Sequence, residues 1–299
     1  MKNRSFIDDF MKFFFSRNML SRLILVNVIV FILANITGLF MSLYNVHHDH
    51  SLFTEWFAVP SNPAILIQKP WTIFTYMFLQ EEFMHILFNM ITLYFGGTLF
   101  LQFLGGKKLL TTYIFGGVSG AAFYILAFNY FPAFSDVVKV SYALGASASV
   151  LAVLVAIAIY VPDYTVQLVL FGRIKMKYIA LVFVLIDVLS IEKENPGGHI
   201  AHLGGALFGF TYIMLLKKNR NMFGFFKPVA TFFKKLFTPK PKLKVEYKKN
   251  GRPLTDDEYT KVRAEKQKKM DAILDKISKN GYNSLSKEEK EFLFSASNR

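Results

Sequence analysis

Two side chains far apart in the sequence, Ser147 and His202, attract attention because each lies inside a largely apolar stretch. A hydroxyl or imidazole group at membrane depth costs free energy unless it is paired, so such residues are candidates for function. A serine hydroxyl alone is a weak nucleophile, but an adjacent imidazole can take its proton and later return it to a leaving amine. The pair therefore predicts nucleophilic catalysis if the fold brings the two groups within about 2.6–3.2 Å.

Two further polar side chains, His85 and Asn89, lie four residues apart and therefore on one face of a helix. With the backbone N–H of Ser147, they offer hydrogen-bond donors for the anion of a tetrahedral intermediate. We expect them at the same depth as Ser147 and His202. The remaining histidines, His47, His48, His50 and His199, are read as solvated or structural groups near the outer surface.

Six apolar runs have about the 17–25 residues that can cross a bilayer, although the fifth is short. They are Met19–Met41, Met84–Leu104, Leu109–Asn129, Tyr142–Tyr160, Lys177–Ile191 and Gly198–Leu216. Ser147 and His202 each fall about five residues into their runs, roughly 7–8 Å below the outer edge at 1.5 Å per residue. Small residues, among them Gly145, Gly205 and Gly209, should let these helices approach closely, and Gly116 and Gly120 are read as packing positions.

Composition and charge agree with a membrane protein. Hydrophobic residues make up 53% of the chain and charged residues 19%, and there is no cysteine. These values argue against extensive disorder and against a disulfide-stapled scaffold. Lys and Arg gather at the amino terminus and in alternate loops, whereas the other loops are acidic or nearly neutral. The positive-inside rule then predicts an all-α protein with six spans and both termini in the cytoplasm.

The chain is expected to have four parts: a cytoplasmic segment at 1–18, a membrane domain at 19–216, a basic juxtamembrane segment and linker at 217–254, and a helical hairpin at 255–299. Residues 217–299 hold 22 basic and 10 acidic residues. Phenylalanines and lysines at 222–237 fit either an interfacial segment on an anionic leaflet or a stub packed on the bundle.

The hairpin is expected to begin its helices with two capping boxes. These pair Thr255 with Glu258 and Ser286 with Glu289. Met270, Ile273, Leu274 and Ile277 form an apolar stripe that Phe292–Phe294 would cover, and Gly281 would end the first helix. We expect the hairpin to dock a cytoplasmic partner or to regulate the membrane domain. Interleaved acidic residues argue against a nucleic-acid partner.

Three motifs, taken together and in order, resemble the rhomboid family of intramembrane serine proteases. They are PWTIFTYMFLQEEFMHILFNM, Gly145-Ala146-Ser147-Ala148, and NPGGHIAHLGGALFG. The resemblance implies a six-helix bundle in which Ser147 is the nucleophile, His202 the base, and His85 and Asn89 the oxyanion donors, supported by Gly145, Gly205 and Gly209. It implies no cofactor and no metal, transmembrane substrates cut near the outer face, and residence in a bacterial inner membrane.

Several positions depart from the family pattern. Ala148 replaces a frequent glycine and should place a methyl beside the oxyanion site, while Thr72, Gln80 and Leu151 replace residues that commonly support the loop or the base. No acidic residue lies one turn from His202 on its own helix, so a dyad is expected. Asp187 is the only acidic residue well inside a span.

Two alternative functions remain open from the sequence. One is a catalytically silent relative that binds transmembrane clients; the presence of both Ser147 and His202 argues against it, and the departures at Gln80 and Ala148 keep it open. The other is a metal or proton carrier built on His85, His199 and His202, against which we count the lack of a carboxylate to complete the set.

Overall fold

The computed structural model describes residues 18–46, 50–168, 172–192, 195–220, 222 and 255–297. The predictions for most of segment 1–18, for His47 and His48 and for most of 217–254 therefore concern residues outside the described part. The chain divides into two compact units, Met1–Val229 and Ala230–Arg299.

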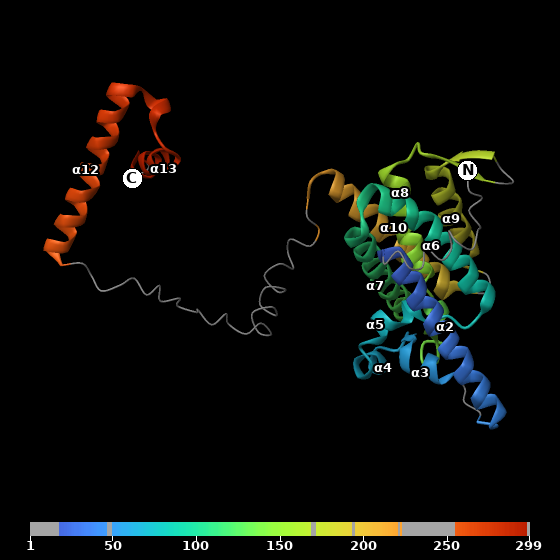
Figure 1. Ribbon diagram of the computed structural model, residues 1–299. Helices are drawn as coiled ribbons and strands as arrows, with labels where there is room; N and C mark the ends of the chain where they lie inside the picture. The colour runs from blue at the N-terminus through green and yellow to red at the C-terminus, as the bar shows by residue number, and fades with distance from the viewer. Residues whose placement is uncertain are drawn as a thin grey trace. The chain divides into compact units, whose positions relative to one another are not determined.

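The first unit is a helical bundle (Figure 1). Its principal helices are α2 (Met19–Leu43), α6 (Phe83–Leu104), α7 (Gly106–Tyr130), α8 (Ser147–Tyr160), α9 (Met176–Ser190) and α10 (Pro196–Lys217). At one end lie the short elements α3 (Leu52–Phe57), α4 (Pro63–Gln68), α5 (Thr72–Thr75) and η1 (Tyr76–Phe78), and η2 (Pro132–Phe134) follows α7. Each predicted apolar run overlaps one of the principal helices over most of its length.

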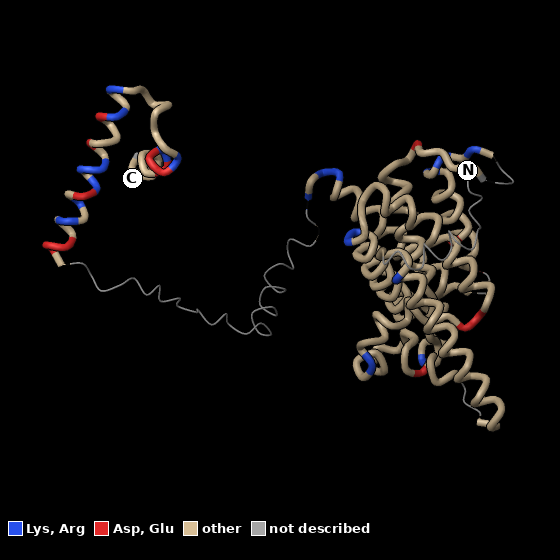
Figure 2. Tube along the Cα trace, in the orientation of Figure 1, with Lys and Arg blue, Asp and Glu red and all other residues tan. Residues whose placement is uncertain are grey.

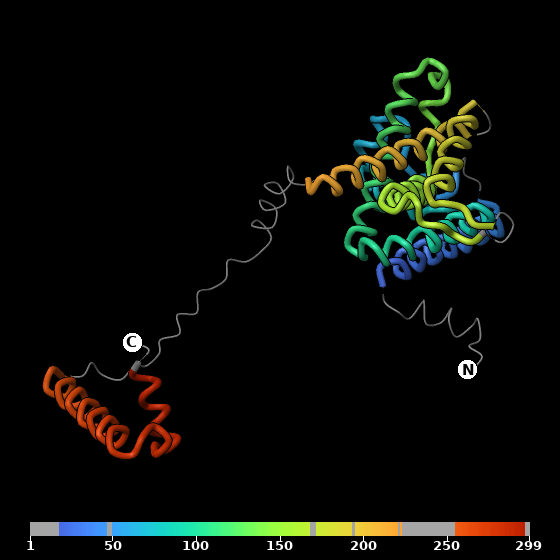
Figure 3. The backbone as a smooth tube through the Cα atoms, turned by 90° about the horizontal axis from the view of Figure 1, so that it is seen from above, coloured from blue at the N-terminus to red at the C-terminus, as the bar shows by residue number. Residues whose placement is uncertain are grey.

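Four of these helices, α2, α6, α7 and α10, are long and apolar enough to cross a membrane. Charged residues of this unit lie mainly toward its two ends (Figure 2). The other two helices are shorter, with 14 residues in α8 and 15 in α9. Residues Ala148–Ala158 of α8 are all buried, and Figure 3 shows this helix in the middle of the bundle. Because protein surrounds α8, its length need not match the bilayer.

The fourth apolar run is not helical at its start, which corrects the prediction that Ser147 lies five residues into a span. Tyr142–Ala143 forms strand β2, which pairs antiparallel with β1 (Val59–Pro60). Gly145 then has a φ of +133°, a conformation that suits glycine and interrupts a helix. Helix α8 therefore begins at Ser147 itself. A second hairpin, β3 (Thr165–Leu168) with β4 (Gly172–Lys175), precedes α9.

Small residues hold α8 between α7 and α10. A side chain at Gly116 or Gly120 of α7 would collide with the methyl of Ala152 or Ala148. Substituents on the α10 glycines Gly205 and Gly209 would meet the backbone carbonyls of the same two alanines. The packing interpretation of these glycines is confirmed, and it places the backbones of α8 and α10 in direct contact.

The second unit contains α12 (Asp256–Asn280), η4 (Tyr282–Ser284) and α13 (Lys287–Ser297). Both capping boxes are confirmed, since the N–H groups of Thr255 and Ser286 donate to Glu258 and Glu289 at 3.0 and 2.7 Å. Gly281, with φ +74°, ends α12 as predicted. The predicted cover of the apolar stripe is wrong in part, because Phe294 remains 73% exposed and Leu274 52% exposed.

Candidate active site

The position of Ser147 is set by the turn that precedes α8. The N–H of Gly145 donates to the carbonyl of Tyr76 at 3.0 Å, which ties this turn to the segment before α6. A Cβ at Gly145 would lie 3.1 Å from the imidazole Cε1 of His85 and 3.5 Å from the Ser147 hydroxyl. Glycine therefore leaves room for His85 beside the serine, and Ser147 is the first residue of its helix.

His202 reaches Ser147 from the neighbouring helix. Helix α10 begins with Asn195 as its N-cap, whose side chain accepts from the N–H of Gly198 at 3.0 Å. Two turns after Gly198, the close packing of Gly205 against α8 brings α10 and α8 together. The Nε2 atom of His202 lies 2.5 Å from Oγ of Ser147. The structure thus brings together the two residues that the sequence singled out for nucleophilic chemistry.

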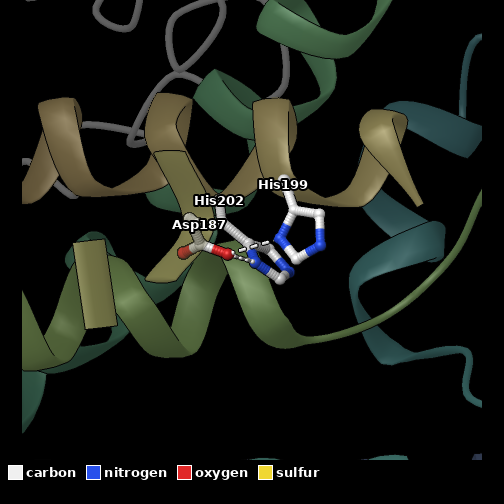
Figure 4. A group of neighbouring side chains, drawn as sticks. All are labelled: Asp187, His199 and His202. Carbon is white, nitrogen blue, oxygen red and sulfur yellow. Dashed lines mark hydrogen bonds and ion pairs between the residues drawn. The ribbon is translucent and has the colours of Figure 1, made fainter. Parts of the chain in front are cut away.

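A third side chain, Asp187 of α9, completes a chain of hydrogen bonds. Its Oδ1 lies 2.7 Å from Nδ1 of His202 and 2.8 Å from Nδ1 of His199 (Figure 4). The expectation of a dyad takes into account a carboxylate only on His202's own helix, whereas the carboxylate that bonds His202 comes from α9. His199, which was expected to be a solvated or structural group, is held within the structure, since its imidazole shares this carboxylate. The sequence signal that pointed to Asp187 was its position as a single acidic residue inside an apolar run.

The same three residues could in principle hold a cation. The ligand atoms of Asp187, His199 and His202 lie within 4.8 Å of one another, so the carboxylate whose lack counted against a metal site is present after all. However, both imidazole Nδ1 atoms are already directed at one carboxylate oxygen at hydrogen-bond distance. A cation would have to replace both hydrogen bonds and would occupy the atom through which His202 contacts Asp187.

A cavity of about 190 Å³ lies beside the Ser147 hydroxyl. His85 and Asn89 of α6 line it together with Ser147 and His202, so all four predicted site residues face one space. The remaining lining is mostly apolar and includes Phe88, Val150, Leu151, Phe183 and Ile186. A larger hollow of about 530 Å³, bordered by Glu81, Glu82 and the start of α10, shares His85 with this cavity. The shared imidazole places the more polar hollow next to the serine.

Asn89 is held by a buried polar relay that the sequence did not reveal. Its Nδ2 donates to Oε1 of Gln80 at 2.8 Å, and Gln80 donates to Oδ1 of Asn27 at 3.2 Å. Asn27 in turn donates to the hydroxyl of Tyr113, which donates to the carbonyl of Met77, both at 2.9 Å. Buried amides need such partners. The relay uses one N–H of Asn89 and fixes the direction of the other.

Two departures from the family pattern take on a different meaning in the structure. The prediction that the Ala148 methyl lies beside the oxyanion site is wrong, because this methyl packs against Gly120 of α7. The loop in which Thr72 departs from the family pattern is anchored by hydrogen bonds of its own. The Trp71 indole donates to the carbonyl of Trp56 at 2.8 Å, and the Thr72 hydroxyl donates to that of Lys69 at 2.7 Å.

The fold and its apolar helices define a multi-pass helical membrane protein. Residues 68–219 match the family model of the Rhomboid domain, which covers half of the chain. The chain therefore belongs to the rhomboid family. It is 29% identical over 161 residues to RHOMBOID-like protein 12, mitochondrial, of Arabidopsis thaliana, and this match spans 51% of the chain and 48% of that relative. Residues 255–299 match a family of unknown function (DUF6576).

Proposed function

We propose that this protein is an intramembrane serine endopeptidase that cuts transmembrane segments of other membrane proteins near the outer face. The observation that carries the proposal is the contact of 2.5 Å between Nε2 of His202 and Oγ of Ser147, beside a cavity lined by His85 and Asn89. A serine hydroxyl and an imidazole in this relationship are the parts that acyl transfer requires.

The reaction begins with attack of the Ser147 Oγ on the scissile carbonyl carbon. The hydroxyl proton passes to Nε2 of His202 while the new C–O bond forms. As the tetrahedral intermediate collapses, the imidazolium gives the same proton to the leaving amine and the peptide C–N bond breaks. Water, activated in turn by His202, then hydrolyses the acyl-enzyme and restores the serine.

The oxyanion of each intermediate needs donors in a poorly solvated place. We assign this role to the side chains of His85 and Asn89 and to the backbone N–H of Ser147, which is at the start of α8 and makes no intrahelical bond. The relay through Gln80 presets the direction of the Asn89 amide. Preset donors are effective because they need no reorganisation when charge develops.

The topology belongs to the proposal as well. All six principal helices would cross the membrane, with both termini on the side of the basic loops. A single-span substrate would have to unwind near its outer end, since a helix hides its carbonyls in hydrogen bonds, and helix-destabilising residues there would help. Residence in a bacterial inner membrane stays a prediction, because the relative named above is called mitochondrial.

The test is a cleavage assay on a reporter transmembrane substrate in proteoliposomes. Wild type should cleave it, and Ser147→Ala should not. The matched control is Ser149→Ala, which removes a buried hydroxyl from the same helix that is directed at Gly117 of α7. Full cleavage by Ser147→Ala would refute the proposal. Binding of the reporter by a wild type that never cuts it would instead favour the client-binding alternative.

A further inference from the structure

We propose that Asp187 is a positioning residue for His202, so that this rhomboid protein works with a Ser147–His202–Asp187 triad in which His199 holds the carboxylate from a second side. The inference rests on the proposed function. The inference goes beyond that function because a dyad of Ser147 and His202 would need neither Asp187 nor His199.

Asp187 lies where an apolar side chain would serve packing better. It is 6% exposed, and the residues around it in α9, from Ile179 to Leu189, are otherwise all apolar. Removing a carboxylate from water is costly unless hydrogen bonds and charges compensate. Among the described residues, the ion-pair partners of Asp187 are the two imidazoles of His199 and His202. A buried acid with only these partners indicates a role in the chemistry of the histidines.

The geometry selects the form of His202 that can act as a base. A neutral imidazole carries one proton, on either Nδ1 or Nε2. Because Asp187 Oδ1 accepts a hydrogen bond from Nδ1 at 2.7 Å, the proton is held there. Nε2 then presents its lone pair to the Ser147 hydroxyl at 2.5 Å. Among the residues that the structure describes, no other group at Nδ1 of His202 would favour this tautomer if the carboxylate were removed.

The carboxylate also stabilises the charge that forms during attack. The Ser147 proton moves to Nε2 as the bond from Oγ to the carbonyl carbon forms, and the imidazole becomes a cation with Nδ1–H still bonded to Asp187. Asp187 keeps its negative charge throughout and takes no proton, as in other serine triads. The proton on Nε2 leaves with the amine, so the histidine ends each half-reaction neutral.

His199 differs from His202 in what it can reach. It lies three residues earlier on α10, and its Nδ1 bonds the same Oδ1 of Asp187 at 2.8 Å (Figure 4). Its ring stands nearly perpendicular to that of His202, at 85°. The cavity at Ser147 is lined by Asp187 and His202. We therefore assign His199 to holding the rotamer of the carboxylate, which predicts a smaller effect on turnover when His199 is replaced.

The test compares single variants of the full-length protein in proteoliposomes, with kcat and KM for a reporter substrate and the rate of labelling by a fluorophosphonate. Asp187→Asn should lower kcat and the labelling rate by about a hundredfold or more while KM changes little, because the amide can favour the wrong tautomer. Asp187→Glu, which keeps the carboxylate, should recover part of this loss. His199→Gln should cost about tenfold, and the same-helix control Ser190→Ala should match wild type.

Two results would overturn the inference. If Asp187→Asn keeps kcat within about threefold of a wild type whose Ser147→Ala form is inactive, a dyad suffices and the proposed function stands alone. If a chelator abolishes wild-type turnover, the cluster of Asp187, His199 and His202 is a metal site. Should Asp187→Asn lose much of its fold, the labelling rate of the correctly folded fraction decides the matter, since labelling of that fraction at the wild-type rate would show a purely structural carboxylate.

Discussion

The side chain of Asn89 donates a hydrogen bond of 2.8 Å to Gln80, a residue nine positions earlier that is completely buried. This bond couples a predicted oxyanion donor on α6 to a relay that continues to Asn27 on α2 and Tyr113 on α7. The direction of one site residue thus depends on three other segments of the bundle.

Removing Gln80 tests this coupling. We expect Gln80→Ala to lower kcat about tenfold, a fraction of the loss seen when an oxyanion donor is removed outright, because Asn89 remains but is no longer held. Steady-state cleavage of the reporter measures the effect. Thr98→Ala on the same α6, whose hydroxyl donates to the Tyr94 carbonyl of its own helix, should have normal kcat. Wild-type turnover in Gln80→Ala would show that the relay does not position Asn89.

Asn89 itself should matter more. Asn89→Ala is expected to lower kcat by about 10²–10³-fold, or roughly 2.7–4 kcal/mol, if its free N–H stabilises the oxyanion. KM should change little, since the bond is made chiefly in the transition state. A change confined to KM would assign Asn89 to substrate binding instead.

The contact of α8 with α10 predicts a strong effect at Gly209. A methyl there would press on the backbone carbonyl of Ala152, which cannot move aside easily, so Gly209→Ala should destabilise the bundle by about 1–3 kcal/mol. Thermal unfolding in detergent measures the loss. The matched control is Gly38→Ala in α2, where nothing lies within 4 Å of the added atom and stability should hold or rise. Equal behaviour of the two variants would argue against close packing.

The carboxy-terminal unit should be dispensable for folding of the membrane domain. Each unit makes its own internal contacts, and the division falls near Val229. A chain that ends at Lys240 should therefore keep the unfolding temperature of the full-length protein and its cleavage of the reporter. A large fall in unfolding temperature would mean that the unit is integral to the bundle.

The hairpin should be sensitive to acid through Glu289. The N–H of Ser286 and then the ammonium of Lys276 lower the pKa of the Glu289 carboxyl below its ordinary value of 4.5. Because the folded-state pKa is the lower one, the stabilisation is present above pH 4.5 and is lost as the pH falls through the folded value. The protection factors of the α13 amides in the full chain, which correct for the intrinsic exchange rate at each pH, should therefore fall as the pH drops through the folded-state pKa of Glu289. Glu289→Gln should show lower protection factors already at neutral pH and little further change in them on acidification.

Much of this protein follows from local sequence pattern. Hydropathy located a helix in every apolar run, because the spacing of apolar residues reflects the environment of a single element. The capping pairs Thr255 with Glu258 and Ser286 with Glu289 were predictable since each lies within one turn. The motifs around Ser147 and His202 likewise indicated the family, and residues 68–219 match its model.

Relations between helices were decided only by the tertiary structure. Periodicity tells which residues share a face of one helix but not the distance from that face to the next helix, so Asp187 could not be paired with His202 beforehand. The start of α8 at Ser147 depends on pairing of Tyr142–Ala143 with Val59–Pro60, more than eighty positions away in the chain. The direction of the Ala148 methyl, which points toward Gly120, was also decided by tertiary contacts. The close contact of glycines with neighbouring backbones sets how each helix is rotated about its axis.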